Sequence, residues 1–232
     1  DNCFNLNSLA AETAPGKLSQ RSGATAQFTE LMVLLGIDRG QAMAISGAAA
    51  DWIDSDGNDG PLGAEDGVYR ALPGAYLPAN RKMIDVSELR AVRGVTPKIY
   101  ARLKPWICAL PRAEPVKLNV NTLRPEQAPL IAMLMPGQIS IADARAALAA
   151  RPAGGYGSSV RFWEARSLAR LDPPTEVGEQ AAVTSRWLTL TTQVTIGDGF
   201  LTAHSLIDVN GGAPGAGQAP PVIVRRDWGE AD

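Results

Sequence analysis

Apolar residues recur at helical spacing through much of the chain. One such segment begins at Ala24 and stops at Gly36, and a second runs from Asp38, a predicted N-cap, to about Ile53. Further helical segments are predicted after Asp85 or Ser87, from Pro97 to Leu110 with a kink or end near Pro105, and at about 124–134, 140–150 and 159–171. We therefore expect the region from about residue 24 to 171 to be all helix.

The period of the apolar positions changes from 3.6 to 2 near residue 183. Alternation over 187–196 predicts a strand, Gly197-Asp198-Gly199 a turn, and 201–209 the return strand of a hairpin. A third strand is predicted at 222–224, and residues 1–9 suit a short strand or an extended lead-in. Helices that interrupt a β element predict an α+β fold, divided into a sheet domain (1–20 and 172–232) and an inserted helical domain (21–171).

Composition places the chain among soluble globular proteins. It has 232 residues, 22 basic and 24 acidic, a net charge of −2 and 45% hydrophobic residues, which excludes disorder. The near-neutral charge gives no whole-protein attraction to nucleic acid, and no apolar run is long enough to span a membrane. Because the chain begins with Asp1 rather than Met, we expect a processed or truncated product.

The two cysteines, Cys3 and Cys108, are too few for a thiolate zinc site and lack the spacing of a CxxC redox motif. Spacing alone leaves two possibilities, two free thiols or one disulfide between the N-terminus and the middle of the chain. A disulfide would lower the conformational entropy of the unfolded state, which would stabilise the fold by about 4 to 5 kcal/mol. It would also indicate an oxidising compartment.

The segment 51–66 has the sequence DWIDSDGNDGPLGAED, with six acidic residues and no basic one. Counted from Asp54, oxygen-bearing side chains fall at the first, third, fifth and twelfth positions of a calcium loop: Asp54, Asp56, Asn58 and Glu65. A hard divalent cation takes six to eight oxygens, and without it the carboxylates would repel one another. The pattern predicts a structural calcium site.

The agreement with a calcium loop is incomplete. Asp59 stands at the sixth position, where such a loop needs glycine, and no clear helix is expected after Glu65. Asp51 and Asp66 are left as candidates for a second ion or for an outer shell. The alternatives are a solvated acidic loop or another metal, magnesium being less suited to so many carboxylates and carbonyls.

The segment 89–96 is similar to one helix-hairpin-helix unit, in which a glycine turn presents backbone amides to a phosphate. Gly94 supplies that turn, although Thr96 replaces the usual second glycine. Basic residues occur nearby: Arg81, Lys82, Arg90, Arg93, Lys98, Arg102 and Lys104. Nucleic-acid binding is thus the alternative function, and packing within the protein is the simpler interpretation.

No catalytic motif is evident in the sequence. There is no G-x-S-x-G, phosphate-binding loop or dinucleotide glycine pattern. The single histidine, His204, alternates with its neighbours along a predicted strand, which favours a sheet histidine over a catalytic base. We expect no enzymatic activity.

Four stretches together resemble the K-type minor pseudopilin of the bacterial type II secretion system. They are 3–9 (CFNLNSL), 87–94 (SELRAVRG), 108–111 (CALP) and 119–123 (NVNTL). Each is weak alone, but their order and spacing agree along nearly the whole chain. The resemblance implies a pilin-like domain for residues 1–20 and 172–232, with the helical domain inserted between its strands.

The resemblance also implies calcium, with two ions, and candidate ligands Asp54, Asp56, Asn58, Asp59, Glu65 and Asp66, with Asp51 possible. It implies a non-enzymatic subunit that joins I-type and J-type minor pseudopilins at the pseudopilus tip. There such subunits start assembly, cap the fibre and support export of folded proteins across the outer membrane. Exported proteins are further possible partners, and nucleic acid is not expected.

Members of this family begin with a hydrophobic helix that anchors them in the inner membrane of a Gram-negative bacterium. Neither that helix nor the strand after it precedes Cys3 here. We therefore expect a soluble periplasmic fragment of a single-pass protein. The periplasm is oxidising, so the same placement favours a Cys3–Cys108 disulfide.

Overall fold

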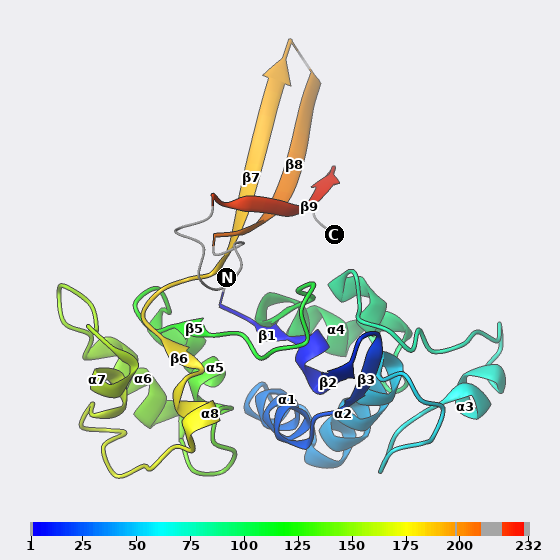
Figure 1. Cartoon of the computed structure of the whole chain (residues 1–232), viewed down its shortest axis with the longest axis horizontal. Coiled ribbons are helices and arrows are strands. Elements are labelled where there is room, and N and C mark those ends of the chain that lie inside the picture. The colour runs from blue at the N-terminus through cyan, green and yellow to red at the C-terminus, as the bar shows by residue number, and fades with distance from the viewer. Residues whose placement is uncertain (1, 198, 210–219, 230–232) are drawn as a thin grey trace. The chain divides into compact units, whose positions relative to one another are not determined.

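The computed structural model describes residues 2–197, 199–209 and 220–229. The chain divides into two compact units: a larger one, Asn2–Val183, and a smaller one that begins at Thr184. Helices with short strands make up the first unit, and three strands make up the second (Figure 1). The structure confirms the predicted α+β class.

Helices α1 (Ser22–Leu34) and α2 (Arg39–Ile53) are neighbours at the centre of the larger unit (Figure 1). The turn between them contains Gly36 at φ 79°, and the Asp38 carboxylate accepts a hydrogen bond from the Gln41 N–H at 3.1 Å, as expected for an N-cap. Apolar residues of both helices are buried, and Phe28 stacks on Phe4 at 4.9 Å between ring centroids. Both helices were predictable from their spacing.

The remaining helices are short. They are α3 (Asp66–Arg70), η2 (Val86–Ala91), α4 (Pro97–Leu103), η3 (Lys104–Trp106), η4 (Pro125–Gln127), α5 (Ala128–Ala132), α6 (Ile141–Ala149), α7 (Ser159–Trp163) and α8 (Thr175–Gly178). Of these, α3 and α8 occur where the sequence predicts no helix. Asp85 and Thr96 form the expected N-caps.

Two predicted helices end early for identifiable reasons. Helix α4 gives way to a 3₁₀ turn at Pro105, which has no N–H to continue the helix. Beyond α7, the N–H groups of Ala165, Leu168 and Leu171 bond carbonyls three residues earlier, so turns replace the expected helix to Leu171.

Short strands also occur in the larger unit, and two of them, β4 (Ile107–Cys108) and β5 (Leu118–Asn119), lie where only helices are predicted. β1 (Phe4–Asn5) pairs in parallel with β4 (Ile107–Cys108), and β5 (Leu118–Asn119) with β6 (Ala181–Ala182). β2 (Ala10–Ala14) and β3 (Lys17–Gln20) form an antiparallel hairpin. The expectation of an all-helical region from 24 to 171 is therefore wrong, because two-residue strands are too short to show alternation.

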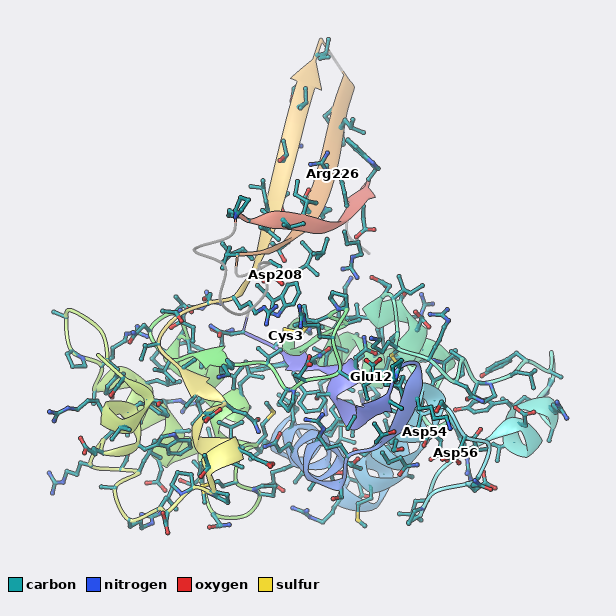
Figure 2. The ribbon with its side chains drawn as sticks, viewed as in Figure 1. Cys3, Glu12, Asp54, Asp56, Asp208 and Arg226 are labelled. Atoms are coloured by element: carbon teal, nitrogen blue, oxygen red, sulfur yellow. A yellow bond between two sulfur atoms is a disulfide. The ribbon has the colours of Figure 1, made fainter. Side chains whose placement is uncertain are left out.

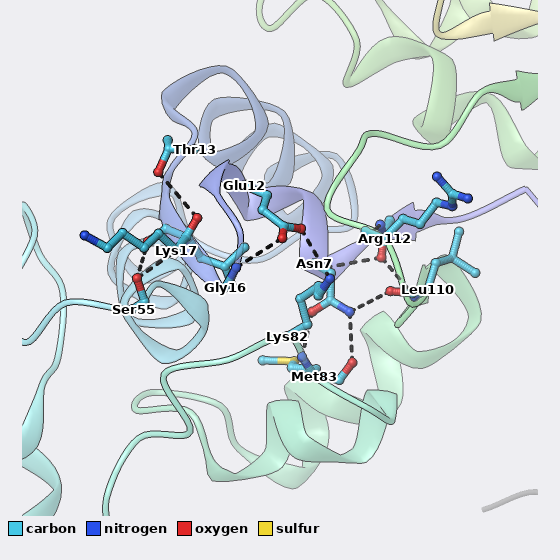
Figure 3. Close-up of polar contacts among 12 residues, drawn as sticks. Asn7, Glu12, Thr13, Gly16, Lys17, Ser55, Lys82, Met83, Leu110 and Arg112 are labelled. Atoms are coloured by element: carbon cyan, nitrogen blue, oxygen red, sulfur yellow. Dashed lines mark hydrogen bonds and ion pairs between the residues drawn. The ribbon is translucent and has the colours of Figure 1, made fainter. Parts of the chain in front are cut away.

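The N-terminal segment is bound into the larger unit. Buried Asn7 donates to the carbonyls of Met83 (2.8 Å) and Leu110 (2.7 Å) and accepts from the Met83 N–H at 2.7 Å (Figure 3). A disulfide joins Cys3 to Cys108, which confirms the predicted bridge. The compact units thus differ from the expected domains: residues 2–20 and 172–183 pack with the helices rather than with the later strands.

The smaller unit is an antiparallel sheet of order β7-β8-β9. β7 (Trp187–Ile196) pairs with β8 (Gly199–Asp208) in a register from Trp187↔Asp208 to Ile196↔Gly199, and β9 (Val222–Trp228) adds along one part of β8. This confirms the predicted hairpin and third strand, although turn residue Asp198 lies outside the described residues. The Asp208 carboxylate, labelled in Figure 2, accepts from the Arg186 Nε and Nη2 at 2.9 and 2.8 Å.

Candidate metal site

The acidic segment forms the loop between α2 and α3. Asp54 is the C-cap of α2, and Glu65 is the N-cap of α3, so helices flank the loop on both sides. The expectation that no helix follows Glu65 is wrong, because five residues directly after it are helical. Figure 2 shows Asp54 and Asp56 together where α2 ends.

Asp51 holds the loop against α2. Its fully buried carboxylate accepts hydrogen bonds from the Ala64 N–H (2.7 Å), from the Gly60 N–H (3.2 and 3.3 Å to its two oxygens) and from the Gln20 amide. A Cβ added at Gly63 would lie only 1.8 Å from an Asp51 oxygen, so this loop position requires glycine. Asp51 therefore organises the loop backbone.

Asp54 and Glu65 are buried, and carboxylate oxygens of both residues lack a hydrogen-bond partner. Their residues are 1% and 3% exposed, and Asp54 Oδ1 and both Glu65 carboxylate oxygens have no hydrogen-bond partner. Burial, together with the charges of nearby acids, raises the pKa of Glu65 to about 7. Burial also raises the pKa of Asp54 to about 6, although a hydrogen bond from Gln20 opposes the shift. Buried carboxylates with open lone pairs are costly unless a cation or a proton compensates them.

Two further predicted ligands lie on the exposed part of the loop and interact with its backbone. Asp56 Oδ1 accepts from the backbone and side-chain N–H groups of Asn58, both at 2.9 Å. Asp59 Oδ1 accepts from the Glu65 N–H at 2.9 Å. The charges of Asp56 and Asp59 both contribute to the raised pKa of Glu65, so these acids share one electrostatic environment.

Asp66 differs from the other predicted ligands. It lies in the first turn of α3 and pairs with Arg70 at 2.8 Å on the same helix. The structure thus brings together Asp51, Asp54 and Glu65, with Asp56 and Asp59 nearby, and directs Asp66 to an internal ion pair.

The buried unpartnered oxygens fit a hard cation, because carboxylate and carbonyl oxygens are the ligands that calcium prefers. Among the described residues, no three His, Cys, Asp or Glu side chains are already arranged to hold a metal ion. Binding would therefore draw the carboxylates closer together, which suits the flexible coordination shell of calcium better than the strict octahedron of magnesium.

The β2–β3 hairpin contributes to this site in a way that the sequence pattern does not reveal. Ser55 binds Leu18 through its backbone N–H (3.0 Å to the carbonyl) and through its hydroxyl, which donates to the Leu18 carbonyl (3.1 Å) and accepts from its N–H (3.0 Å). Figure 3 shows Ser55 beside this hairpin. The Pro15-Gly16 dipeptide was a turn signal for the hairpin, but nothing in the sequence pairs it with the acidic loop.

The glycine turn at Gly94 packs against the protein itself. Gly94 has φ 86°, and a Cβ there would lie 3.2 Å from Ile45 of α2. The Arg93 N–H donates to the Tyr69 hydroxyl at 3.2 Å, and its guanidinium contacts the Gly63 carbonyl at 3.4 Å. These contacts favour the packing interpretation over phosphate binding.

His204 lies on β8, as expected of a sheet histidine. Its Nδ1 is 3.1 Å from the hydroxyl of Thr191, the residue opposite it on β7.

Comparisons with known proteins agree on one family. Two family models described as type II secretion system protein K match residues 2–112 and 118–184. The chain is 34% identical to type II secretion system protein K of Klebsiella pneumoniae, over 98% of this chain and 67% of that protein. It is 33% identical to the protein K of Pectobacterium carotovorum subsp. carotovorum, over 90% of this chain and 63% of that protein.

The fold has a solved counterpart. A chain in the crystal structure of the GspK-GspI-GspJ complex from enterotoxigenic Escherichia coli matches with a TM-score of 0.79 and 30% identity, over 99% of this chain and 77% of that one. The described residues contain no helix long and apolar enough to cross a membrane. The chain spans about two thirds of the length of the protein K relatives it matches. On these matches, it belongs to the type II secretion system protein K family.

Proposed function

We propose that this protein is a non-catalytic minor pseudopilin at the tip of the type II secretion pseudopilus. In this role it starts assembly, caps the fibre and supports export of folded proteins across the outer membrane. The observation that carries the proposal is the match of nearly the whole fold to a chain of the GspK-GspI-GspJ complex. The partners that follow are the I-type and J-type minor pseudopilins.

The proposed location is the periplasm, with the full-length protein anchored in the inner membrane. The Cys3–Cys108 disulfide supports this location, because structural disulfides persist in oxidising compartments. The disulfide and the hydrogen bonds of Asn7 hold the N-terminal segment in the larger unit.

Calcium binding by the acidic loop is part of the proposal. Asp54 and Glu65 would be central ligands, since their buried oxygens lack partners, and Asp56 and Asp59 lie on the same loop. A bound calcium ion supplies positive charge, which would replace repulsion among these carboxylates with attraction. The second ion that the family resemblance implies stays a prediction.

Assembly can be tested with the periplasmic domains of the I-type and J-type minor pseudopilins from the same organism. We expect the three purified proteins, mixed in millimolar calcium, to elute together in size-exclusion chromatography, ahead of any single component. A domain with the pilin fold but from an unrelated system serves as the control. Elution of this chain as a separate peak at micromolar concentrations would contradict the proposed assembly.

A further inference from the structure

We propose that Gln20 is a further ligand of the calcium site, through its side-chain oxygen, and that the bound cation thereby fastens the β2–β3 hairpin to the acidic loop. The inference rests on the proposed calcium binding. It adds a residue 31 positions before Asp51 in the sequence, outside the loop motif.

The Gln20 amide lies among the buried acids. Its Nε2 donates to Asp51 Oδ1, and the Gln20 side chain is close enough to Asp54 to oppose the rise in the pKa of that carboxyl. The Gln20 side chain therefore lies beside the carboxylates that a cation would bind. The amide NH₂ group supplies partial positive charge there, as a cation would supply full charge.

The surrounding backbone keeps the Gln20 amide in this place. A Cβ at Gly60 would lie 2.6 Å from Gln20 Nε2 and 3.0 Å from its Oε1, so the loop approaches the amide as closely as glycine permits. The three hydrogen bonds between Ser55 and Leu18 fix β3 beside the start of the loop. Both terminal atoms of the Gln20 amide are thus held at the site by two connected segments.

Rotation of the amide by about 180° would exchange its two ends. Oε1 would then face the site, where a calcium ion accepts neutral amide oxygens together with carboxylates. Nε2 would face Gly60 or solvent, because Gln20 is exposed. The Glu65 oxygens, buried and without partners, indicate independently that the site lacks positive charge.

A link between the hairpin and the cation has a structural consequence. Residues 12–17 of the hairpin are exposed, so little apolar burial holds its tip. Besides the Ser55 contacts, an ion pair between Glu12 and Lys82 (3.6 Å) connects it to the rest of the unit. Calcium would therefore order this hairpin together with the loop, and calcium removal would loosen both.

The experiment measures calcium affinity by isothermal titration calorimetry on the wild-type chain and on Gln20→Ala, Gln20→Glu and the control Gln138→Ala. Gln138 is exposed and lies after α5, outside the loop and the hairpin. We expect Gln20→Ala to weaken calcium binding about tenfold or more, since loss of an orienting group alone costs that much. Gln20→Glu retains an oxygen ligand, so its affinity should equal or exceed that of the wild type.

Amide hydrogen exchange on the same proteins gives the second readout. Calcium should slow exchange in residues 10–20 of the wild type and of Gln138→Ala, and should slow it much less in Gln20→Ala. Equal calcium affinity and equal hairpin protection in Gln20→Ala and wild type would overturn the role of Gln20 while leaving the calcium site in place. Absence of calcium binding by the wild type would overturn the proposed calcium site and, with it, the role of Gln20.

Discussion

At the scale of single residues, the contribution of Asp54 and Glu65 to folding stability depends on what neutralises their charge. Both are buried, both have oxygens without hydrogen-bond partners, and each has a pKa raised chiefly by burial. Their charge opposes folding when no cation is present and favours binding when one is. One substitution should therefore have opposite effects in the two conditions.

Glu65→Gln tests this reversal of sign. In chelator at pH 8, the variant should be more stable than wild type by about 1 to 3 kcal/mol, because it removes a buried charge that is repelled by its neighbours. In millimolar calcium it should lose most of the stabilisation that calcium gives. Urea unfolding measures both, with Glu126→Gln as an exposed control. A variant that is destabilised equally in both conditions would contradict the electrostatic interpretation.

The pH dependence has a defined sign. For a carboxyl whose pKa is raised on folding, the folded state binds the proton more tightly, so the stabilising effect is present below the ordinary pKa and lost as pH rises through the raised value. In chelator, Glu65 should therefore contribute a loss of stability between about pH 4.5 and 7, and Asp54 a similar loss that ends near pH 6. With calcium the trend should reverse, because the cation binds the deprotonated carboxylates.

Urea unfolding of wild type and Glu65→Gln across pH 4 to 8 in chelator isolates the contribution of Glu65, since other groups titrate in both proteins. The wild type should lose stability relative to the variant as pH rises. A constant difference between the two proteins over that range would mean that Glu65 has an ordinary pKa.

The sequence revealed some of these residues but not their roles. The spacing of Asp54, Asp56, Asn58 and Glu65 predicts a calcium loop, and calcium binding there stays a prediction. It could not show that Asp51 holds the loop backbone, or that Asp66 pairs with Arg70, since both follow from local geometry. The Gln20 contact depends on the folding of a hairpin far away in the sequence.

At the scale of elements, the N-terminal segment is held to the larger unit by one covalent and several polar links. The Cys3–Cys108 disulfide closes a loop with a sequence separation of 105. In the chain-entropy model, closing such a loop lowers the entropy of the unfolded chain and so stabilises the fold by about 4 to 5 kcal/mol. Nearby, Asn5 donates to the carbonyls of Arg112 (2.8 Å) and Glu114 (3.1 Å).

The variant Cys3→Ser/Cys108→Ser should therefore unfold about 4 kcal/mol more easily than wild type. Because the polar links remain, its calcium affinity should change little. Urea unfolding and calcium titration of the same protein check the two statements. A loss of less than about 1 kcal/mol would show that the disulfide contributes little beyond the polar links.

Asn7→Ala should destabilise the larger unit by about 3 kcal/mol, because it leaves the Met83 N–H and two buried carbonyls without their partner. Asn58→Ala, on the exposed loop, serves as the control in chelator. Unfolding of both variants at the same urea concentration would contradict the role assigned to Asn7.

Long elements were predictable and short ones were not. Helices α1 and α2 and strands β7 and β8 are long enough for a period to be visible, and their predicted positions agree with the structure. The two-residue strands β1, β4, β5 and β6 pair across large sequence separations and have no periodic signal. For the same reason, the sequence pattern predicts residues 1–20 with the later strands rather than with the helices.

At the scale of the whole molecule, the proposed function places the protein in an assembly, and calcium would stabilise the unit that carries most of the fold. We expect the full-length protein to restore secretion in a strain that lacks its own protein K. Asp54→Ala/Glu65→Ala should restore it less, and Asp143→Ala, outside the site, should restore it normally. Secreted protein in the culture medium is the readout. Full restoration by the double variant would show that secretion does not need the acidic loop.

The most direct measurement is thermal unfolding of this chain in millimolar calcium, and again in a calcium chelator with magnesium present. A ligand that binds only the folded state stabilises it by mass action. At about a hundredfold excess over the dissociation constant, the midpoint should rise by about 5 to 10 °C in calcium and not in magnesium. Identical unfolding curves in the two solutions would contradict a calcium site in the loop between α2 and α3.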